Sequence, residues 1–461
     1  MLGLILLIYG FIEYKRKNYY NFYIVFFLFI TNGYQIIPDV ILLMPALGIT
    51  KSYDYASFLI LGIILTEFSA LWVFVKKYWI FISPIGLLLI VCGLDFFFSK
   101  IVFGYSWNSV IRTFRNYLLL FSPFLFMRVP LPIDKKLLKF IVIVTVLQSI
   151  LYILQIVLHA PLIKSAVAGE ATGRVLENGY SRFYNLPNFV IPSLIIVAYC
   201  AVMSTKFQRN LVMGILATVL LSSLHRNLIL VVFPVMFMYK LVFNPSRNIA
   251  LFALIPIAFL ILMATPVIGD RINEGFDQAS GTADISNIHA AINNYDNSET
   301  NTSTFRYLHF AERFLFVINQ PQYIPFGLGM LTEDSPEAQK LDFKIGTVST
   351  DSQTYKPKQI DTGDIAWSAI IITTGFTGLV AMVYFIVFYI RLLYKNRFFA
   401  VAKVMLIWLT ILLFISFFGT EIISIPFRAF FSFLLCLFIK CYYFKPESTA
   451  SSILTPVTAN K

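Results

Sequence analysis

The chain has 461 residues, of which 58 % are hydrophobic and only 13 % are charged, and its formal net charge is +12. A soluble domain typically carries about 25 % charged residues. The composition therefore excludes the ordinary soluble classes and predicts an all-α polytopic membrane protein that crosses a lipid bilayer. The positive charge does not indicate nucleic-acid binding, because the basic residues cluster at the ends of apolar runs, where the positive-inside rule places them. The four cysteines lie in or beside apolar segments, so no disulfide framework is predicted.

Apolar runs of about 20 residues, long enough to cross a bilayer, recur along the chain and predict about 12–13 transmembrane helices. The Lys/Arg clusters expected at their cytoplasmic ends are 13–18, 76–77, 128–136, 206–210, 244–248, 391–397 and 440–445. Between successive clusters there is room for a pair of spans. The first apolar run lacks a charged n-region and a cleavage site, so we expect no removable signal peptide.

This alternation predicts four parts. Residues 1–266 form transmembrane helices with short loops, and 267–364 form one large extracytoplasmic loop. Residues 365–445 form the C-terminal transmembrane helices, and 446–461 form a disordered cytoplasmic tail. The loop begins with a polar, flexible stretch and continues with "STFRYLHFAERFLFVINQP". That stretch predicts an amphipathic helix with Ser303 or Thr304 as N-cap and Pro321 beyond its end.

The stretch "SSLHR" places a His-Arg pair between two strongly apolar runs. An arginine at the middle of a bilayer costs about 2.5–3.5 kcal/mol on the most lenient scale. The alternation resolves this conflict, because it puts the junction on the side opposite the cytoplasm. Arg226 should therefore lie at the outer surface, near the start of a helix.

Other arginines are also predicted to face outward: Arg112, Arg115, Arg174, Arg182, Arg306, Arg313 and Arg428. This excess runs against the positive-inside trend and calls for an anionic partner. Guanidinium forks suit phosphate and carboxylate oxygens, and a lipid-linked pyrophosphate is such a partner. Simpler interpretations stay open. Arg112 and Arg115 could snorkel to headgroups, and Arg306 and Arg313 could lie on a solvated helix face.

The remaining outward polar residues have structural interpretations. His225 and His309 are lone histidines, for which a hydrogen-bonding role is expected before catalysis. Glu421 and Arg428 could form a structural ion pair. No acids with metal-ligand spacing and no Gly-rich phosphate loop are present, so neither a metal site nor a nucleotide-driven pump is predicted.

A Ser-x-x-Arg junction followed by one long outer loop resembles the superfamily of bacterial surface-polysaccharide polymerases and ligases. These are the Wzy-type repeat-unit polymerases and the WaaL-type O-antigen ligases. "SRFYNLPNFVIPSL" resembles the family's outer Arg-containing segment. "FRYLHFAERFLFVINQPQYIPFGLGM" matches the pattern of Arg, helix, Pro and Gly-x-Gly, with Gly327 and Gly329 in the last positions. "DIAWSAIIITTGFTG" matches a polar residue followed by Gly-x-x-Gly, at Asp364, Gly375 and Gly378. The resemblance covers roughly residues 170–390.

The resemblance implies a GT-C-like membrane glycosyltransferase that needs neither metal nor cofactor. The donor would be an oligosaccharide on polyprenyl (undecaprenyl) pyrophosphate, and the acceptor a sugar hydroxyl on a second lipid-linked unit. Polyprenyl pyrophosphate would leave, at the outer face of the bacterial cytoplasmic (inner) membrane. The product would be a repeat-unit polymer such as the O-antigen of lipopolysaccharide, a capsule or an exopolysaccharide. Further partners of such a protein are a chain-length regulator and a flippase.

Charge considerations assign roles within that chemistry. Arg226 and Arg306 are the first choices for stabilising the leaving pyrophosphate, with Arg182 and Arg112 behind them. Asp364, at the boundary between loop and membrane, could accept the proton of the attacking hydroxyl. The further candidates are Asp361 as reserve base and Arg115, Arg313, Gly327 and Gly329 as substrate-binding residues. Either aspartate could instead cap the next helix.

Two other functions are alternatives to the polymerase. Ligases of this superfamily have His-Asn where this chain has Asp364-Ile365, which favours a polymerase over an O-antigen ligase acting on a lipid A core. A lipid-linked oligosaccharide flippase would distribute charged residues through its spans to line a cavity, whereas here they lie at the span ends.

The topology can be tested by labelling. Ser298→Cys lies in the predicted outer loop and Ser451→Cys in the predicted inner tail. An impermeant thiol reagent should label Ser298→Cys in intact cells, with any outer membrane permeabilised, and Ser451→Cys only after lysis. Labelling of Ser451→Cys alone in intact cells would invert the topology.

Overall fold

The computed structural model describes residues 2–164, 173–175, 181–243, 288–295, 302–347, 357–360 and 365–443. Within these ranges regular structure is almost entirely helical, as predicted. The one sheet among them is an antiparallel pair, β1 (Gly173–Val175) and β2 (Ser181–Phe183), with Arg174 opposite Arg182. The α-helices run through α1 (Leu2–Lys15), α2 (Tyr19–Ile30), α3 (Asp39–Leu42), α4 (Tyr53–Thr66), α5 (Phe68–Ile101), α6 (Trp107–Phe114), α7 (Ser122–Phe126), α8 (Leu131–Leu158), α9 (Val190–Tyr199), α10 (Lys206–Ser222), α11 (Arg226–Phe243), α14 (Ile288–Asn293), α15 (Thr302–Asn319), α16 (Pro336–Gln339), α17 (Ala366–Lys395), α18 (Ala400–Ile415) and α19 (Ile425–Tyr443). Short 3-10 helices are η1 (Gly33–Gln35), η2 (Pro45–Leu47), η3 (Arg115–Phe121), η5 (Pro321–Tyr323) and η6 (Glu421–Ile423).

Five helices in the described ranges are long and apolar enough to cross a membrane: α5, α8, α11, α17 and α19. Shorter apolar helices, α2, α4, α9 and α18, accompany them. The chain is thus a helical protein with helices fit to span a bilayer. The total of about 12–13 spans stays a prediction, because residues 244–287 lie outside the described ranges.

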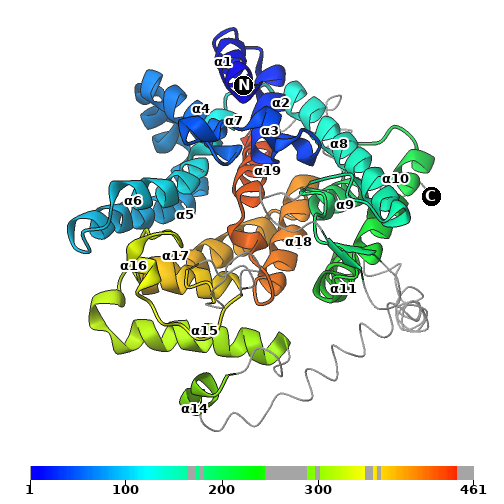
Figure 1. Ribbon diagram of the computed structural model, residues 1–461. Coiled ribbons are helices and arrows are strands. Elements are labelled where there is room, and N and C mark those ends of the chain that lie inside the picture. Colours follow the sequence, from blue (N-terminus) through cyan, green and yellow to red (C-terminus); the bar gives the residue numbers. More distant parts are fainter. Residues whose placement is uncertain are drawn as a thin grey trace.

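The core is built around α18 and α19, which lie near the centre of the molecule (Figure 1). The apolar window of α19 is 78 % buried, whereas that of α11 is only 22 % buried. A helix that is apolar on all sides belongs inside a helix bundle. Aromatic rings join α19 to its neighbours: the ring of Phe27 lies 6.2 Å from that of Phe430 and 5.9 Å from that of Phe433.

The predicted cytoplasmic clusters contact one another. Lys440 Nζ donates to Asp134 Oδ2 at 2.6 Å, which joins 440–445 to 128–136. Arg128 donates to the Tyr14 hydroxyl at 2.9 Å, beside the cluster at 13–18. Basic segments far apart in the sequence therefore gather at one end of the bundle.

The predicted outer segments also contact one another. Gln155, near the end of α8, donates to Asn185 Oδ1 at 2.9 Å. From Asp134 to Gln155 a helix rises roughly 30 Å, which is about the thickness of the hydrocarbon core. The two sets of contacts thus lie one bilayer apart along α8. Which end faces outside stays a prediction.

The predicted loop helix is confirmed as α15. It begins at Thr302, so Ser303 and Thr304 lie inside the helix and the prediction of either as its N-cap was wrong. Three consecutive hydroxyl residues make the start ambiguous from sequence, since each can cap a helix. The helix ends at Asn319, before Pro321, as predicted.

Two glycine-containing segments pack backbone against backbone. Gly375 interrupts α17 with φ 60° and ψ −155°, and Gly327 has φ 59°. Leu328 N donates to Ile372 O at 2.7 Å. A Cβ on Gly375 would lie 2.5 Å from Gly327 N. Only residues without a Cβ allow this approach, so the loop segment that contains Gly327 packs directly against α17.

Gly329 makes a similar close contact with α5. It has φ 76°, and a Cβ there would collide with Ser99 Oγ. Met330 N donates to Ser99 Oγ at 2.7 Å. The loop segment 327–330 is therefore held between two membrane-spanning helices.

Gly375→Ala should disrupt the close packing of Gly375 against Gly327. Its backbone lies in a region that is essentially restricted to glycine, where other residues cost about 1–3 kcal/mol, and the added methyl group also collides with the Gly327 amide. We expect a clearly lower unfolding temperature in detergent. The matched control is Gly214→Ala on α10, where an added Cβ meets no atom within 4 Å and helix propensity improves by about 1 kcal/mol. A parental unfolding temperature for Gly375→Ala would contradict the claim that this close contact stabilises the fold.

Candidate functional site

The turn between α10 and α11 presents Arg226 as the first residue of α11. The buried Ser223 hydroxyl donates to Leu220 O at 2.8 Å and accepts from His225 N at 3.3 Å. Leu224 has φ 53°, a left-handed conformation that costs a non-glycine residue about 1–2 kcal/mol. Hydrogen bonds on both sides of Leu224 hold the turn in this conformation, which fixes Arg226 at the start of α11.

The strand β2 brings Arg182 to the same turn. Its Nη2 lies 3.4 Å from His225 Nδ1, and its guanidinium carbon lies 5.0 Å from the centre of the Tyr184 ring. Burial, together with the charge of Arg182, lowers the pKa of His225 to about 4. His225 is therefore neutral at pH 7, and its Nδ1 can accept from Arg182. We call Arg182, His225 and Arg226 the turn group.

Helix α15 places Arg306 beside a carboxylate. Its guanidinium carbon lies 5.7 Å from the centre of the Phe418 ring. Glu421, at the start of η6, lies within electrostatic range of Arg306. The Glu421 side chain is exposed to solvent on one side. Neighbouring protein atoms desolvate the carboxylate in part, which raises its pKa above the usual 4.5, and the charge of Arg306 opposes this shift.

The sequence-based pairing of Glu421 with Arg428 is not what the structure shows. Arg428 instead donates to Asn116 O at 2.8 Å and stacks 4.5 Å from the centre of the Tyr117 ring. The charge that acts on Glu421 is Arg306, from a distant part of the chain.

Arg306 is held close to the start of α17. His309, one helical turn after Arg306, hydrogen-bonds through Nδ1 to Ser368 Oγ at 3.1 Å. Burial and the nearby Arg313 lower the pKa of His309 to about 2, so this ring is neutral. The first helical amide, that of Ala366, donates to Gly419 O at 3.1 Å. The beginning of α17, the middle of α15 and the α18–η6 junction therefore meet.

Arg313 has a different environment from Arg306, although the two lie seven residues apart. Its side chain is 0 % exposed and pairs with Glu312 at 2.9 Å. The guanidinium carbon lies 4.7 Å from the centre of the Phe343 ring. Burial lowers the pKa of Arg313 to about 10, which leaves it protonated at neutral pH. In this structure Arg313 holds the loop together and has no surface for a substrate.

Gly327 and Gly329, also expected to bind substrate, are buried in the backbone packing described above. Their role in the structure is to let the loop approach α17 and α5. They affect the site indirectly, because the same loop carries α15.

A second set of cations surrounds Asp54. Arg115 pairs with Asp54 at 3.0 Å, and Arg112 pairs with Asp334 at 2.6 Å. Lys51 also acts on Asp54, and Arg428 and Arg115 both act on the adjacent Tyr53. We call Lys51, Arg112, Arg115 and Arg428 the second cationic group. Among the residues that the structure describes, this group brings four cations together with the carboxylates of Asp54 and Asp334.

Asp361 and Asp364 lie outside the described residues, as does the side chain of Arg174. Ile365, which follows Asp364, is the N-cap residue of α17, so the expectation that Asp361 or Asp364 caps this helix was wrong. Across the described ranges, no three His, Cys, Asp or Glu side chains are grouped to hold a metal ion. What the site offers is guanidinium groups for an anion and one carboxylate, Glu421, beside Arg306.

Sequence reasoning missed two features of this site. Glu421 carried a signal, since it is an acid between two apolar runs, but its partner was misassigned. Phe418, which stacks on Arg306, gave no signal among 47 phenylalanines.

Comparison with known proteins adds no relative. No model of a protein family matches the chain, and no curated protein matches its sequence. The functional interpretation rests on the arrangement of charges and on the sequence resemblance.

The Glu312–Arg313 pair gives a stability prediction. Glu312 also accepts hydrogen bonds from the amides of Lys344, at 2.8 Å, and Ile345, at 3.2 Å. Glu312→Gln leaves the buried guanidinium without its counter-charge, which typically costs about 3–5 kcal/mol. The unfolding temperature in detergent should fall sharply. Asp342→Asn, an exposed acid in the same loop, is the matched control and should change little. Equal stability of the two variants would contradict a structural role for Arg313.

Proposed function

We propose that this protein is a repeat-unit polymerase of bacterial surface polysaccharides, of the Wzy type, acting at the outer face of the cytoplasmic membrane. The observation that carries the proposal is that partly exposed arginines stand at two turns of a helical bundle, each beside ionisable or aromatic neighbours that hold them. Arg182 and Arg226 meet at the α10–α11 turn, and Arg306 lies beside Glu421 at the start of α17. Such an arrangement suits a membrane-borne pyrophosphate better than a neutral ligand.

The proposed reaction is a glycosyl transfer. The hydroxyl oxygen of the acceptor sugar attacks C1 of the donor, the bond between C1 and the pyrophosphate oxygen breaks, and polyprenyl pyrophosphate leaves with the bonding electrons. Negative charge grows on the leaving oxygen. Guanidinium groups already in place stabilise that charge without reorganising during the step. Arg226 and Arg306 are assigned this role, with Arg182 supporting Arg226 through the turn group.

A carboxylate is proposed to accept the proton of the attacking hydroxyl. Two residues suit this role for different reasons. Asp364 is favoured by the motif that opens α17, and Glu421 by its position next to Arg306 and its raised pKa. A base with a raised pKa is stronger when ionised, and Arg306 helps to keep it ionised near neutral pH.

The arginine roles are testable by substitution. Arg226→Ala and Arg306→Ala should each leave single-repeat glycans and no long chains on a polymer-length gel, with the protein still in the membrane. Lysine should restore chain growth only in part, because it lacks the bidentate fork. Arg16→Ala is the control, since Arg16 is 73 % exposed at the opposite end of the bundle. Normal chain lengths in both alanine variants would remove these arginines from the site.

The two candidate bases can be separated by rate and pH. The variant of the true base, Asp364→Asn or Glu421→Gln, should slow polymerisation in vitro by about 100-fold or more. If Glu421 is the base, the parental rate should fall as the pH drops through a value above 4.5, because protonation removes the acceptor. If Asp364 takes no part in catalysis, Asp364→Asn should be mild, because Ile365 and not Asp364 is the N-cap residue of α17.

Parental rates in both variants would contradict a carboxylate base at either position. Catalysis would then depend on the arginine-assisted departure of the pyrophosphate alone. Loss of activity in Asp361→Asn alone would move the base to Asp361.

A further inference from the structure

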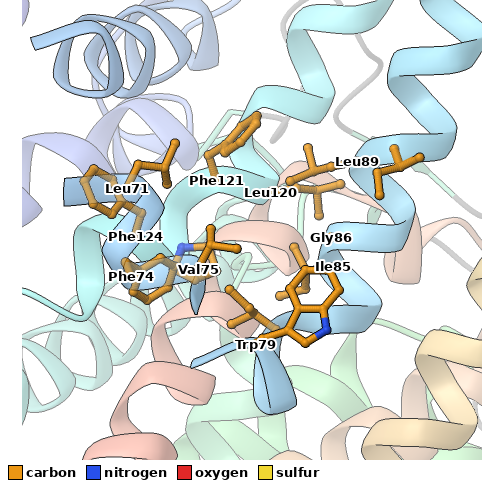
Figure 2. Close-up of a pocket in the computed structure, with 13 residues that line it drawn as sticks. Leu71, Phe74, Val75, Trp79, Ile85, Gly86, Leu89, Leu120, Phe121 and Phe124 are labelled. Atoms are coloured by element: carbon orange, nitrogen blue, oxygen red, sulfur yellow. The ribbon is translucent and has the colours of Figure 1, made fainter. Parts of the chain in front are cut away.

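An apolar groove with a volume of about 360 Å³ lies between α5 and the η3–α7 segment. Figure 2 shows side chains of both segments facing it, with Trp79 and Gly86 on α5 and Leu120 and Phe121 on η3. Every residue that lines it is aliphatic, aromatic, glycine or proline. Nothing in this lining recognises a sugar or a peptide backbone, because hydrogen-bonding groups are almost absent. The lining suits a hydrocarbon chain.

The groove is long and opens to the membrane. Its lining on α5 extends from Leu71 to Ile90, which is roughly 28 Å at the rise of an α-helix. Lys76 and Lys77, in the predicted cytoplasmic cluster, lie within this stretch, so the part inside the hydrocarbon core runs from about Trp79 to Ile90, roughly 17 Å. Neighbouring side chains on α5 face away from the protein, with Ile80 72 % exposed and Val73 65 % exposed. A chain in the lipid phase can therefore enter the groove from the side.

One small residue leaves room for the groove. A Cβ on Gly86 would lie 3.0 Å from the Trp79 ring. Any larger side chain at Gly86 would push the indole or occupy the groove. On the same helix, a Cβ on Gly93 would meet no atom within 4 Å, and Gly93 does not line the groove.

Positive charge lies at the outer end of the groove. The helix η3 begins at Arg115 and reaches the groove at Leu120, a rise of roughly 10 Å in a 3-10 helix. Arg115 belongs to the second cationic group, which gathers four cations within the described part of the chain. An anionic head and a long apolar tail on one molecule would match both features at once.

We propose that this groove holds the isoprenoid chain of the lipid-linked substrate, with its pyrophosphate at the second cationic group. The identity of the head group rests on the proposed function. The assignment of the tail rests on the lining and the length of the groove. It gives Arg112, Arg115 and Arg428 a role distinct from that of Arg226 and Arg306: they hold one lipid-linked unit in the membrane while the other group of arginines faces the reacting bond.

The test uses the full-length protein in phospholipid nanodiscs and a polyprenyl pyrophosphate that carries a diazirine in its chain. After irradiation, labelled peptides are mapped by mass spectrometry. We expect label on residues 71–90 and 120–124, suppressed by unlabelled polyprenyl pyrophosphate and not by added phosphatidylglycerol. Equal suppression by phosphatidylglycerol would identify an annular lipid site. Label elsewhere, or crosslinks between two copies of the chain across the groove, would also overturn the proposal.

Variants sharpen the result. Gly86→Leu should reduce labelling about tenfold, the equivalent of losing contacts of about two methylene groups, whereas Gly93→Leu should label like the parent. Because mapping on the parental protein needs no variant, a folding defect in Gly86→Leu does not remove the test. If the groove is labelled but no chains grow on a lipid-linked repeat unit, the assignment of the groove to the isoprenoid chain stands and the polymerase function is rejected. If chains grow but the label lies outside the groove, the polymerase function stands and the groove assignment is rejected.

Discussion

The close backbone contact between Gly327 and Gly375 determines where the segment 302–347 sits against the helical bundle. Both glycines have positive φ, and neither tolerates a Cβ at that distance. The contact ties a loop outside the membrane-spanning helices to the first half of α17. Helix α15 belongs to the same loop, so the position of Arg306 depends on this packing. Gly327 and Gly375, which resemble parts of a binding motif in the sequence, thus act by positioning the loop that carries Arg306.

The arginines predicted to face outward fall into structural and functional groups. Arg313 is fully buried with Glu312, and this pair stabilises the loop. Arg182, Arg226 and Arg306 keep part of their surface accessible. In a half-exposed arginine of a membrane protein, the aliphatic part of the side chain packs against the protein and aromatic or histidine neighbours contact the guanidinium. Its N–H groups remain able to donate hydrogen bonds to an anion. This division is the physical basis for assigning a pyrophosphate to the accessible group.

Much of the fold was predictable from composition and charge. The apolar runs predicted the helical membrane class. The basic clusters predicted which segments share one side of the membrane, and two of those segments contact each other through Lys440 and Asp134. The hydroxyl-rich start and Pro321 predicted α15 closely. Periodicity could not reveal that Arg313 is buried while Arg306 is accessible, because both lie on one helical face and the difference comes from tertiary packing. The partner of Glu421 was also beyond sequence, since Arg306 is more than a hundred residues away.

The most direct test of the proposed function is a reconstituted reaction with purified protein and a defined lipid-linked repeat unit as both donor and acceptor. The proposal predicts a ladder of longer chains, with one polyprenyl pyrophosphate released for each new glycosidic bond and no added metal or nucleotide required. Release only when a lipid A core is supplied as acceptor would identify a ligase. Protein that labels with the polyprenyl probe yet neither lengthens chains nor releases pyrophosphate would contradict the account.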